Sequence, residues 1–443
     1  MTGAAPGMGV PKNAIERRVD RVAKLWNAFA ADPDLRLLCW SCDRDERRVI
    51  DIFVALESEE AAQTPDAFIR LTSPFEHASS YAPALLEELA TQYAQSREGL
   101  AEAGVPADWR VPEPVSDEAA GRRLLRAARS FHHCYRDRMD RLVLMLVPDR
   151  IDDPAGWLDW LARLAVADVP ASVRIMVTDP SEAPMLAERL EQEAAERAVV
   201  VAPGLDMPAA LDELARSEGE DGPAKQFRIA FVSLGTAAGK GNLKAAQRAA
   251  QTALGIARRE RWIDQEVVVH MALGGARIGA KALGPAADSY REAILAARRA
   301  RQARHPVAGK LELVAAMGLG SALVAAATWP EAARVYEAAA PIAAAAKDAV
   351  MGLEAWRMAA WCHEQAGNDR EAWRCALKAL DAGEALPEPM RATSTLPWVG
   401  DTLLRLLDRH YRDGDHAAVV RRRLETLLGP EWDRAVRREE PAA

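Results

Sequence analysis

The sequence has few cysteines, few aromatic residues and no long apolar run, and each shortage excludes a class of protein. Five cysteines in 443 residues are an odd number, which favours a reducing compartment and free thiols over a disulfide framework. No apolar run reaches the roughly 18 residues of a membrane span. Residues 1–12 are rich in Gly and Pro and lack the apolar core of a signal peptide, so we expect a disordered N-terminus.

The charge balance is mildly acidic, with a net charge of −8 spread over mixed acidic and basic residues. A chain of this kind is a poor candidate for broad nucleic-acid binding. Half of the residues are hydrophobic, which predicts folded domains with sizeable cores. Together these properties predict a cytoplasmic protein that uses neither a membrane nor a nucleic acid.

Short apolar runs alternate with amphipathic stretches over residues 13–217. The runs are apolar on both faces, as in strands that lie between two layers of helices. We predict strands at 35–40, 67–71, 142–147, 173–177 and 198–202, and helices at 13–31, 44–57, 77–100, 117–139, 154–167, 181–196 and 207–217. Strand–helix alternation predicts an α/β domain with a parallel sheet.

Residues 218–224 have the composition of a linker, and from residue 225 the strand signal disappears. Residues 225–430 predict about five helix pairs, and residues 431–443 a frayed tail. The predicted pairs are 225–239 with 242–260, 263–282 with 285–304, 307–327 with 330–346, 348–366 with 369–383, and 397–413 with 416–428. We assign turns to Gly284–Pro285, Trp329–Pro330 and Gly367–Asn368.

Small residues recur at fixed offsets in this half. Leu273–Gly274 is followed by Ala286, Tyr290 and Ala293, at 12, 16 and 19 residues from the glycine. A second copy starts at Leu319–Gly320 and repeats these offsets in Ala332, Tyr336 and Ala339; a third, from Trp356 and Ala360, has Ala372, Ala376 and Ala379. Small residues let antiparallel helices approach, and we expect each tyrosine to fill the gap to the next pair.

This spacing resembles the tetratricopeptide (TPR) repeat. The equivalent positions Gly235, Gly274, Gly320 and Ala360 are separated by 39, 46 and 40 residues, so the helices would be longer than in the 34-residue standard. The resemblance implies an all-α TPR-like superhelix that binds proteins and seldom catalyses a reaction.

In TPR arrays the first helix of each pair lines the concave groove. We therefore predict a partner-binding groove that includes Lys240, Asn242, His270, Arg277, Lys281, Glu354, Arg357 and Trp361. Arg and Lys side chains would hold a carboxylate of a peptide or protein partner, and the tryptophan an apolar side chain.

Two motifs suggest chemistry. Gly235–Gly241 resembles a phosphate-binding loop, but only three residues separate Gly235 from Gly239 and a glycine follows Lys240, so the repeat interpretation is favoured. Cys39 and Cys42 lie where a strand meets a helix, the place of a thiol–disulfide pair. No second cysteine pair or nearby histidine completes a zinc site there.

Acidic residues follow the predicted strands: Asp43, Asp45, Asp149, Asp152, Asp153, Asp179 and Asp206. Ligands of open α/β sheets bind at this edge. The segment Leu142–Asp149 looks like the magnesium-holding strand of P-loop NTPases, and a degenerate, non-hydrolysing relative would explain it. Helix N-caps are the alternative explanation of the same acids.

These patterns predict no catalytic residue, no metal and no cofactor, and they leave the oligomeric state open. The leading hypothesis is a bacterial, cytoplasmic, non-enzymatic adaptor or chaperone, serving a secretion, toxin or defence system. A nucleotide-responsive regulator and a thiol–disulfide enzyme using Cys39 and Cys42 are the alternatives.

Overall fold

The computed structural model describes residues 12–58, 62–115, 119–217, 221–410, 414–430, 432–433 and 436. The chain forms two compact units, residues 1–217 and 218–443. Most of the predicted disordered N-terminus, part of the predicted linker and most of the predicted tail lie outside the described residues.

The first unit alternates strands and helices. In order, its elements are α1 (Ala14–Ala31), β1 (Leu37–Cys42), α2 (Arg44–Leu56), β2 (Ala67–Leu71), α3 (Ala78–Glu102), α4 (Ala120–Cys134), β3 (Leu142–Leu146), α5 (Pro154–Val166), β4 (Val173–Pro180), α6 (Ala187–Glu193), β5 (Ala198–Val201) and α7 (Met207–Ser217). Asn13 and Asp43 begin α1 and α2 with capping boxes that Glu16 and Glu46 complete. The α/β class predicted from the sequence is confirmed.

The five strands form one parallel sheet in the order β2-β3-β4-β1-β5. Leu37 of β1 pairs with Ile175 of β4 on one side and with Ala198 of β5 on the other. Every residue of β3 is buried, because helices cover both faces of the sheet.

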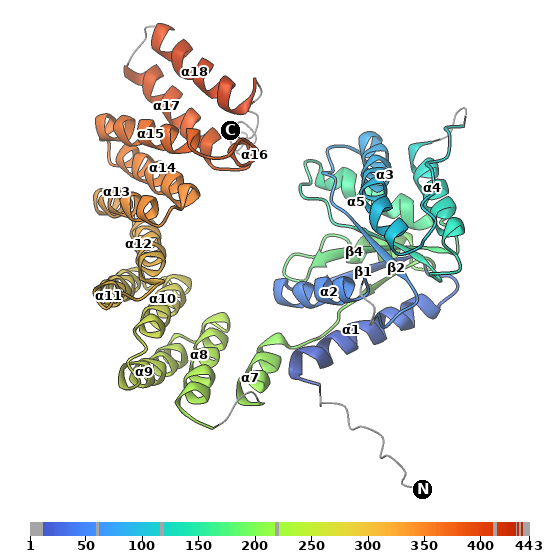
Figure 1. Cartoon of the computed structure of the whole chain (residues 1–443), viewed down its shortest axis with the longest axis horizontal. Coiled ribbons are helices and arrows are strands. Elements are labelled where there is room, and N and C mark those ends of the chain that lie inside the picture. The colour runs from blue at the N-terminus through green and yellow to red at the C-terminus, as the bar shows by residue number, and fades with distance from the viewer. Residues whose placement is uncertain are drawn as a thin grey trace. The chain divides into compact units, whose positions relative to one another are not determined.

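The two faces have separate apolar cores. Leu37 and Cys39 of β1 pack with α3, α4, α5 and α6 on one face, whereas Leu38 and Trp40 pack with α1, α2 and α7 on the other. Figure 1 shows α1 and α2 on one side of the sheet and α3, α4 and α5 on the opposite side. Alternation along the strand therefore sends neighbouring side chains into different cores.

The second unit is helical throughout its described residues. Its elements are α8 (Pro223–Gly239), α9 (Leu243–Arg259), α10 (Ile263–Gly279), α11 (Leu283–Gln302), α12 (Ala308–Ala325), α13 (Trp329–Ala345), α14 (Ala349–Gln365), α15 (Asp369–Glu384), α16 (Glu388–Arg391), α17 (Leu396–His410) and α18 (Gly414–Leu428). Each helix from α8 to α15 packs on the next, as the stack in Figure 1 shows. The fold is therefore an α/β parallel-sheet unit followed by a TPR-like helical array.

Several boundaries differ from the sequence prediction. Strand β1 runs to Cys42 rather than Trp40, because its ladder with β4 continues to Pro180. Gly284–Pro285 and Trp329–Pro330 lie inside the first turns of α11 and α13, and the chain reverses at Lys281 (φ 57°) and Ala327 (φ 54°) instead. Proline fits the first helical turn because its missing N–H has no helical partner there. The four-residue α16 was not predicted.

Helix α12 is 18 residues long and, with a mean hydropathy of 1.4, apolar enough by length and composition to cross a membrane. The packing of α12 inside the helical array explains its high hydropathy. Glu312, inside this helix, is almost fully buried and pairs with Arg298 and Arg301 of α11. Leu313, Leu319 and Leu323 belong to the apolar core of the array. These contacts are those of a core helix in a packed bundle.

The tyrosines of the repeat pack directly on glycine backbone. A Cβ atom at Gly274 would lie 2.7 Å from the Tyr290 ring, and one at Gly318 would lie 2.3 Å from the same ring. Tyr290 of α11 thus lies against α10 of its own pair and α12 of the next pair. At Gly320 the equivalent contact is with Tyr336, at 2.4 Å. The expected close approach at the glycines is confirmed, and Tyr290 fills the gap to the next pair as expected, whereas the Gly320 contact of Tyr336 lies within its own pair.

Replacing Gly318 with alanine should therefore destabilise the array by about 1–3 kcal/mol, the usual cost of overpacking a core. Gly255 in α9 is the matched control, because a Cβ there meets nothing within 4 Å. Gly255→Ala should be neutral or stabilising by about 0.5–1 kcal/mol, the helix preference of alanine over glycine. Urea unfolding measures both, and equal effects of the two substitutions would contradict the packing described here.

Candidate functional site

The first helix of each pair buries most of its surface and leaves one side partly open. On α10 the open side carries Val268, Met271, Gly275 and Ile278, spaced at helical intervals, while Val267, Val269 and Leu273 are buried. The corresponding side of α12 carries Val314, Met317, Ser321 and Val324. Val314, a large apolar side chain in the middle of α12, is 52% exposed.

On helix α14 the equivalent positions carry charged and aromatic residues instead of aliphatic ones. Glu354, Arg357 and Trp361 stand at the offsets from Ala360 that Val314, Met317 and Ser321 have from Gly320. We call these eleven residues the open face: Val268, Met271, Gly275, Ile278, Val314, Met317, Ser321, Val324, Glu354, Arg357 and Trp361.

Contacts between the helices join these positions into one surface. Helix α10 packs on α12, and the Tyr290 ring lies against both. The Tyr336 hydroxyl is 3.4 Å from Ser321 Oγ, and the charges of Glu354 and Arg357 act on the same hydroxyl. Burial raises the pKa of Tyr336 to about 12, so the hydroxyl is neutral. The open face therefore has an apolar zone on α10 and α12 and a charged zone on α14.

The charged zone is held in place by short contacts. Arg357 donates to both carboxylate oxygens of Glu354, each at 2.7 Å, and Thr395 donates to Glu354 at 2.9 Å. The Trp361 ring packs edge-on against Trp329, with ring centroids 5.2 Å apart. A bidentate arginine fixed in this way presents a defined charge pair rather than a freely moving one.

The structure places the predicted groove residues in three different settings. Glu354, Arg357 and Trp361 lie on the open face, as the groove prediction requires. Lys240 and Lys281 are exposed at the ends of α8 and α10, and the Asn242 side chain caps α9 by accepting from the N–H of Ala245. The structure does not bring these three together with the open face of α10.

His270 and Arg277 do not line the open face, which corrects the offset used to place them. His270 is 7% exposed and lies beside Glu266 and Arg258. Arg277 donates to the Pro285 carbonyl and to Ser289 Oγ, at 2.9 and 2.6 Å, and so ties α10 to α11. Their offset from the apolar repeat positions predicted that both would face the groove, but His270 lies beside Arg258 of α9 and Arg277 beside Ser289 of α11. Val268, Met271, Val314 and Met317 were missed because apolar residues on a helix usually indicate a core.

Cys39 and Cys42 cannot act as a thiol–disulfide pair in this fold. Both lie in β1, three residues apart, so they point to opposite faces of the sheet and enter different cores. Burial raises the pKa of Cys39, and it raises the pKa of Cys42 to about 12, which disfavours the reactive thiolate. The thiol–disulfide hypothesis is wrong, because the strand extends through both residues.

The acids at the carboxyl edge of the sheet bind backbone N–H groups. Asp43 caps α2 and Asp153 caps α5. Asp179, 1% exposed, accepts from the N–H groups of Met185, Leu186 and Ala187, and Asp206 accepts from Ala209. The helix-cap explanation of these four acids thus has direct support, whereas Asp149 is exposed and no such contact is described for it.

The segment Gly235–Gly239 lies inside helix α8, so it does not form a phosphate-binding loop.

Asp179→Ala should therefore lower stability by about 1–3 kcal/mol, because three N–H groups lose their acceptor. Asp149→Ala, at an exposed position, should stay within about 0.5 kcal/mol of the wild type. We also expect saturating Mg²⁺–ATP to leave the thermal unfolding midpoint unchanged. A nucleotide-dependent rise that Asp149→Ala abolishes would instead support the nucleotide-responsive regulator.

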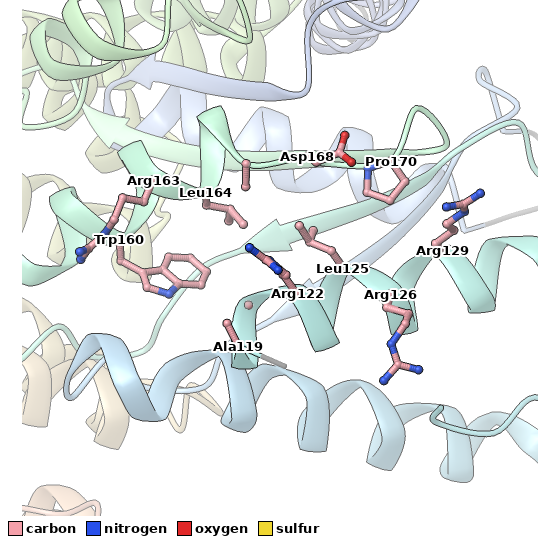
Figure 2. Close-up of a pocket in the computed structure, with 12 residues that line it drawn as sticks. Ala119, Arg122, Leu125, Arg126, Arg129, Trp160, Arg163, Leu164, Asp168 and Pro170 are labelled. Carbon is pink, nitrogen blue, oxygen red and sulfur yellow. The ribbon is translucent and has the colours of Figure 1, made fainter. Parts of the chain in front are cut away.

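A basic depression of 970 Å³ lies between α4 and the end of α5. Figure 2 shows Arg122, Arg126 and Arg129 on one helix and Trp160 and Arg163 on the other. Arg122, Arg129 and Arg163 are exposed, and Leu125 and Leu164 add apolar surface. The α4 arginines have the spacing of an ordinary solvent-exposed helix face, so the sequence analysis does not predict a binding site from them.

Known proteins resemble this chain only in part. No protein-family model and no curated protein matches it. The crystal structure of the apo form of RapI aligns with 51% of this chain and 65% of its own, at 11% identity and a TM-score of 0.40. BtubC from P. vanneervenii aligns with 54% of this chain and 92% of its own, at 14% identity and a TM-score of 0.39. At these values neither likeness carries an argument about function, which must come from the site.

Proposed function

We propose that this protein is a non-catalytic adaptor that holds a segment of a protein partner on the open face. The observation that carries the proposal is the partly exposed apolar zone of α10 and α12, where Val314 is exposed and the apolar residues around it are half-buried. Exposed apolar residues gathered on one surface are typical of interaction sites, whereas scattered ones are not.

The chemistry of the open face indicates what the partner offers. The apolar zone suits aliphatic side chains, and the two methionines, Met271 and Met317, adapt to different shapes. Next to it, Trp361 offers a flat apolar surface, and the Glu354–Arg357 pair offers hydrogen bonds in a fixed orientation. The proposed partner segment is therefore amphipathic, apolar over most of its length and polar at the end that meets α14.

The basic depression of the first unit gives the adaptor a second surface. Its arginines are suited to an acidic segment, because guanidinium groups bind carboxylates through two hydrogen bonds. In this proposal the helical array holds one protein and the α/β unit holds another. The composition, rich in Ala and Arg and poor in Lys, resembles that of high-GC bacterial proteins. The proposal therefore includes a bacterial cytoplasmic setting, with a secretion, toxin or defence system as the pathway that such an adaptor or chaperone would serve.

The test is capture from native lysate with full-length wild type, Val314→Glu and Leu295→Glu, followed by mass spectrometry. Both substituted residues are apolar and about half exposed, at 52% and 48%, so neither should impair folding. Leu295 lies on α11, the second helix of a pair and outside the open face. We expect a protein that wild type and Leu295→Glu enrich and Val314→Glu loses by at least tenfold.

Circular dichroism establishes that both variants are folded. A partner retained by Val314→Glu but lost by Leu295→Glu would move the binding site to the groove between α11 and α13. A partner retained by both would refute the open face as its site and direct attention to the basic depression.

A further inference from the structure

Three metal-ligand side chains meet where α13, α14 and α15 pack together. Glu337, His363 and Cys375 come from these three helices in turn, and their ligand atoms all lie within 4.8 Å of one another. His363 is 9% exposed and Cys375 is fully buried. The open face uses none of the three, so the cluster is separate from the proposed function.

Each ligand atom is oriented toward the others. His363 Nε2 is 2.6 Å from one carboxylate oxygen of Glu337. Arg374 donates to the other oxygen at 2.7 Å and also pairs with Glu371. A neighbouring donor commonly holds one oxygen of a metal-binding carboxylate, as Arg374 does here, and the other Glu337 oxygen, which now accepts from His363, would turn to the metal. The Glu371 carboxylate offsets the positive charge of Arg374.

We propose that Glu337, His363 and Cys375 bind a zinc ion, with water as the fourth ligand. The donor set of one thiolate, one imidazole and one carboxylate matches the ligands that Zn²⁺ takes in proteins. The sulfur argues against Mg²⁺ and Ca²⁺, which select oxygen ligands. Three protein ligands and one water are the composition of an open zinc site rather than a closed structural one.

Zinc binding requires the ligands to lose protons and two ligand atoms to move apart slightly. Burial raises the pKa of Cys375 to about 12, so the free thiol is protonated, and its proton leaves to solvent as the zinc–sulfur bond forms. His363 donates its Nε2 proton to the Glu337 carboxylate in the metal-free protein, so this proton leaves to solvent as the zinc–nitrogen bond forms, and the bound neutral imidazole carries its one proton on Nδ1. The Glu337 oxygen and His363 nitrogen move apart from 2.6 Å to about 3.3 Å, the separation of two ligands each about 2.0 Å from a tetrahedral metal.

No motif in the sequence indicates this site, and the sequence analysis predicts no metal. Glu337 and His363 are 26 residues apart, and no pair of these residues has the short spacing of zinc motifs. Only the packing of consecutive helices brings them together. Zinc would join α14, which carries the charged zone of the open face, to α13 and α15.

The experiment is a titration of the untagged full-length chain with Zn²⁺ in competition with a chelator, and with Co²⁺ followed by its thiolate charge-transfer absorption. The variants are Cys375→Ser, which removes the sulfur ligand, and His363→Gln, which can still donate to Glu337. Cys362→Ser is the matched control, because Cys362 is equally buried beside His363 but outside the cluster.

We expect one zinc per chain, a thiolate band with Co²⁺ and a higher thermal unfolding midpoint with zinc, in both wild type and Cys362→Ser. Cys375→Ser and His363→Gln should bind at least tenfold more weakly, and Cys375→Ser should lose the band. The proposal is overturned if wild type shows no thiolate band, or if Cys375→Ser binds zinc as tightly as wild type. Neither result bears on the adaptor proposal, whose test uses Val314.

Discussion

The contact between a tyrosine ring and glycine backbone is the constraint on which the helical array depends. Tyr290 occupies the space that a Cβ atom would need at both Gly274 and Gly318, so it fixes how closely α10 and α12 approach. The Tyr336 ring occupies the same kind of space at Gly320, and so fixes how closely α13 approaches α12. Both rings reach the edge of the open face, since the Tyr336 hydroxyl is 3.4 Å from Ser321 Oγ and a Cβ at Gly275 would lie 3.8 Å from the Tyr290 hydroxyl. The array thus forms its core while Val314 stays 52% exposed.

Ion pairs between buried carboxylates and half-exposed arginines complement this packing between helices. Glu266 of α10 pairs with Arg258 and Arg299, and Glu312 of α12 pairs with Arg298 and Arg301. Burial alone would raise the pKa of Glu266, but the two guanidinium groups bring it below its ordinary value. Removing one partner of such a pair is costly, because a buried charge is left without compensation. These arginines thus serve the array itself, while the open face is free for another molecule.

Periodic features were predictable from the sequence, and features set by packing were not. Strand–helix alternation and the recurring Gly–Tyr offsets gave the fold class and nearly every element, because both patterns are local. The predicted orientation of His270 and Arg277 was wrong. An offset of one residue turns a side chain by about 100° around a helix, and only the contacts of α10 with α9 and α11 determine which side is buried. The Glu337, His363 and Cys375 cluster depends on three helices meeting, which no local pattern records.

The central claim is that the open face of α10, α12 and α14 contacts the partner. Photo-crosslinking in native lysate tests it most directly, with a photoreactive amino acid placed at position 314 or, for comparison, at position 295. The account predicts a covalent adduct with one protein from position 314 and none with that protein from position 295. An adduct from position 295 alone would contradict it, since the partner would then lie on α11.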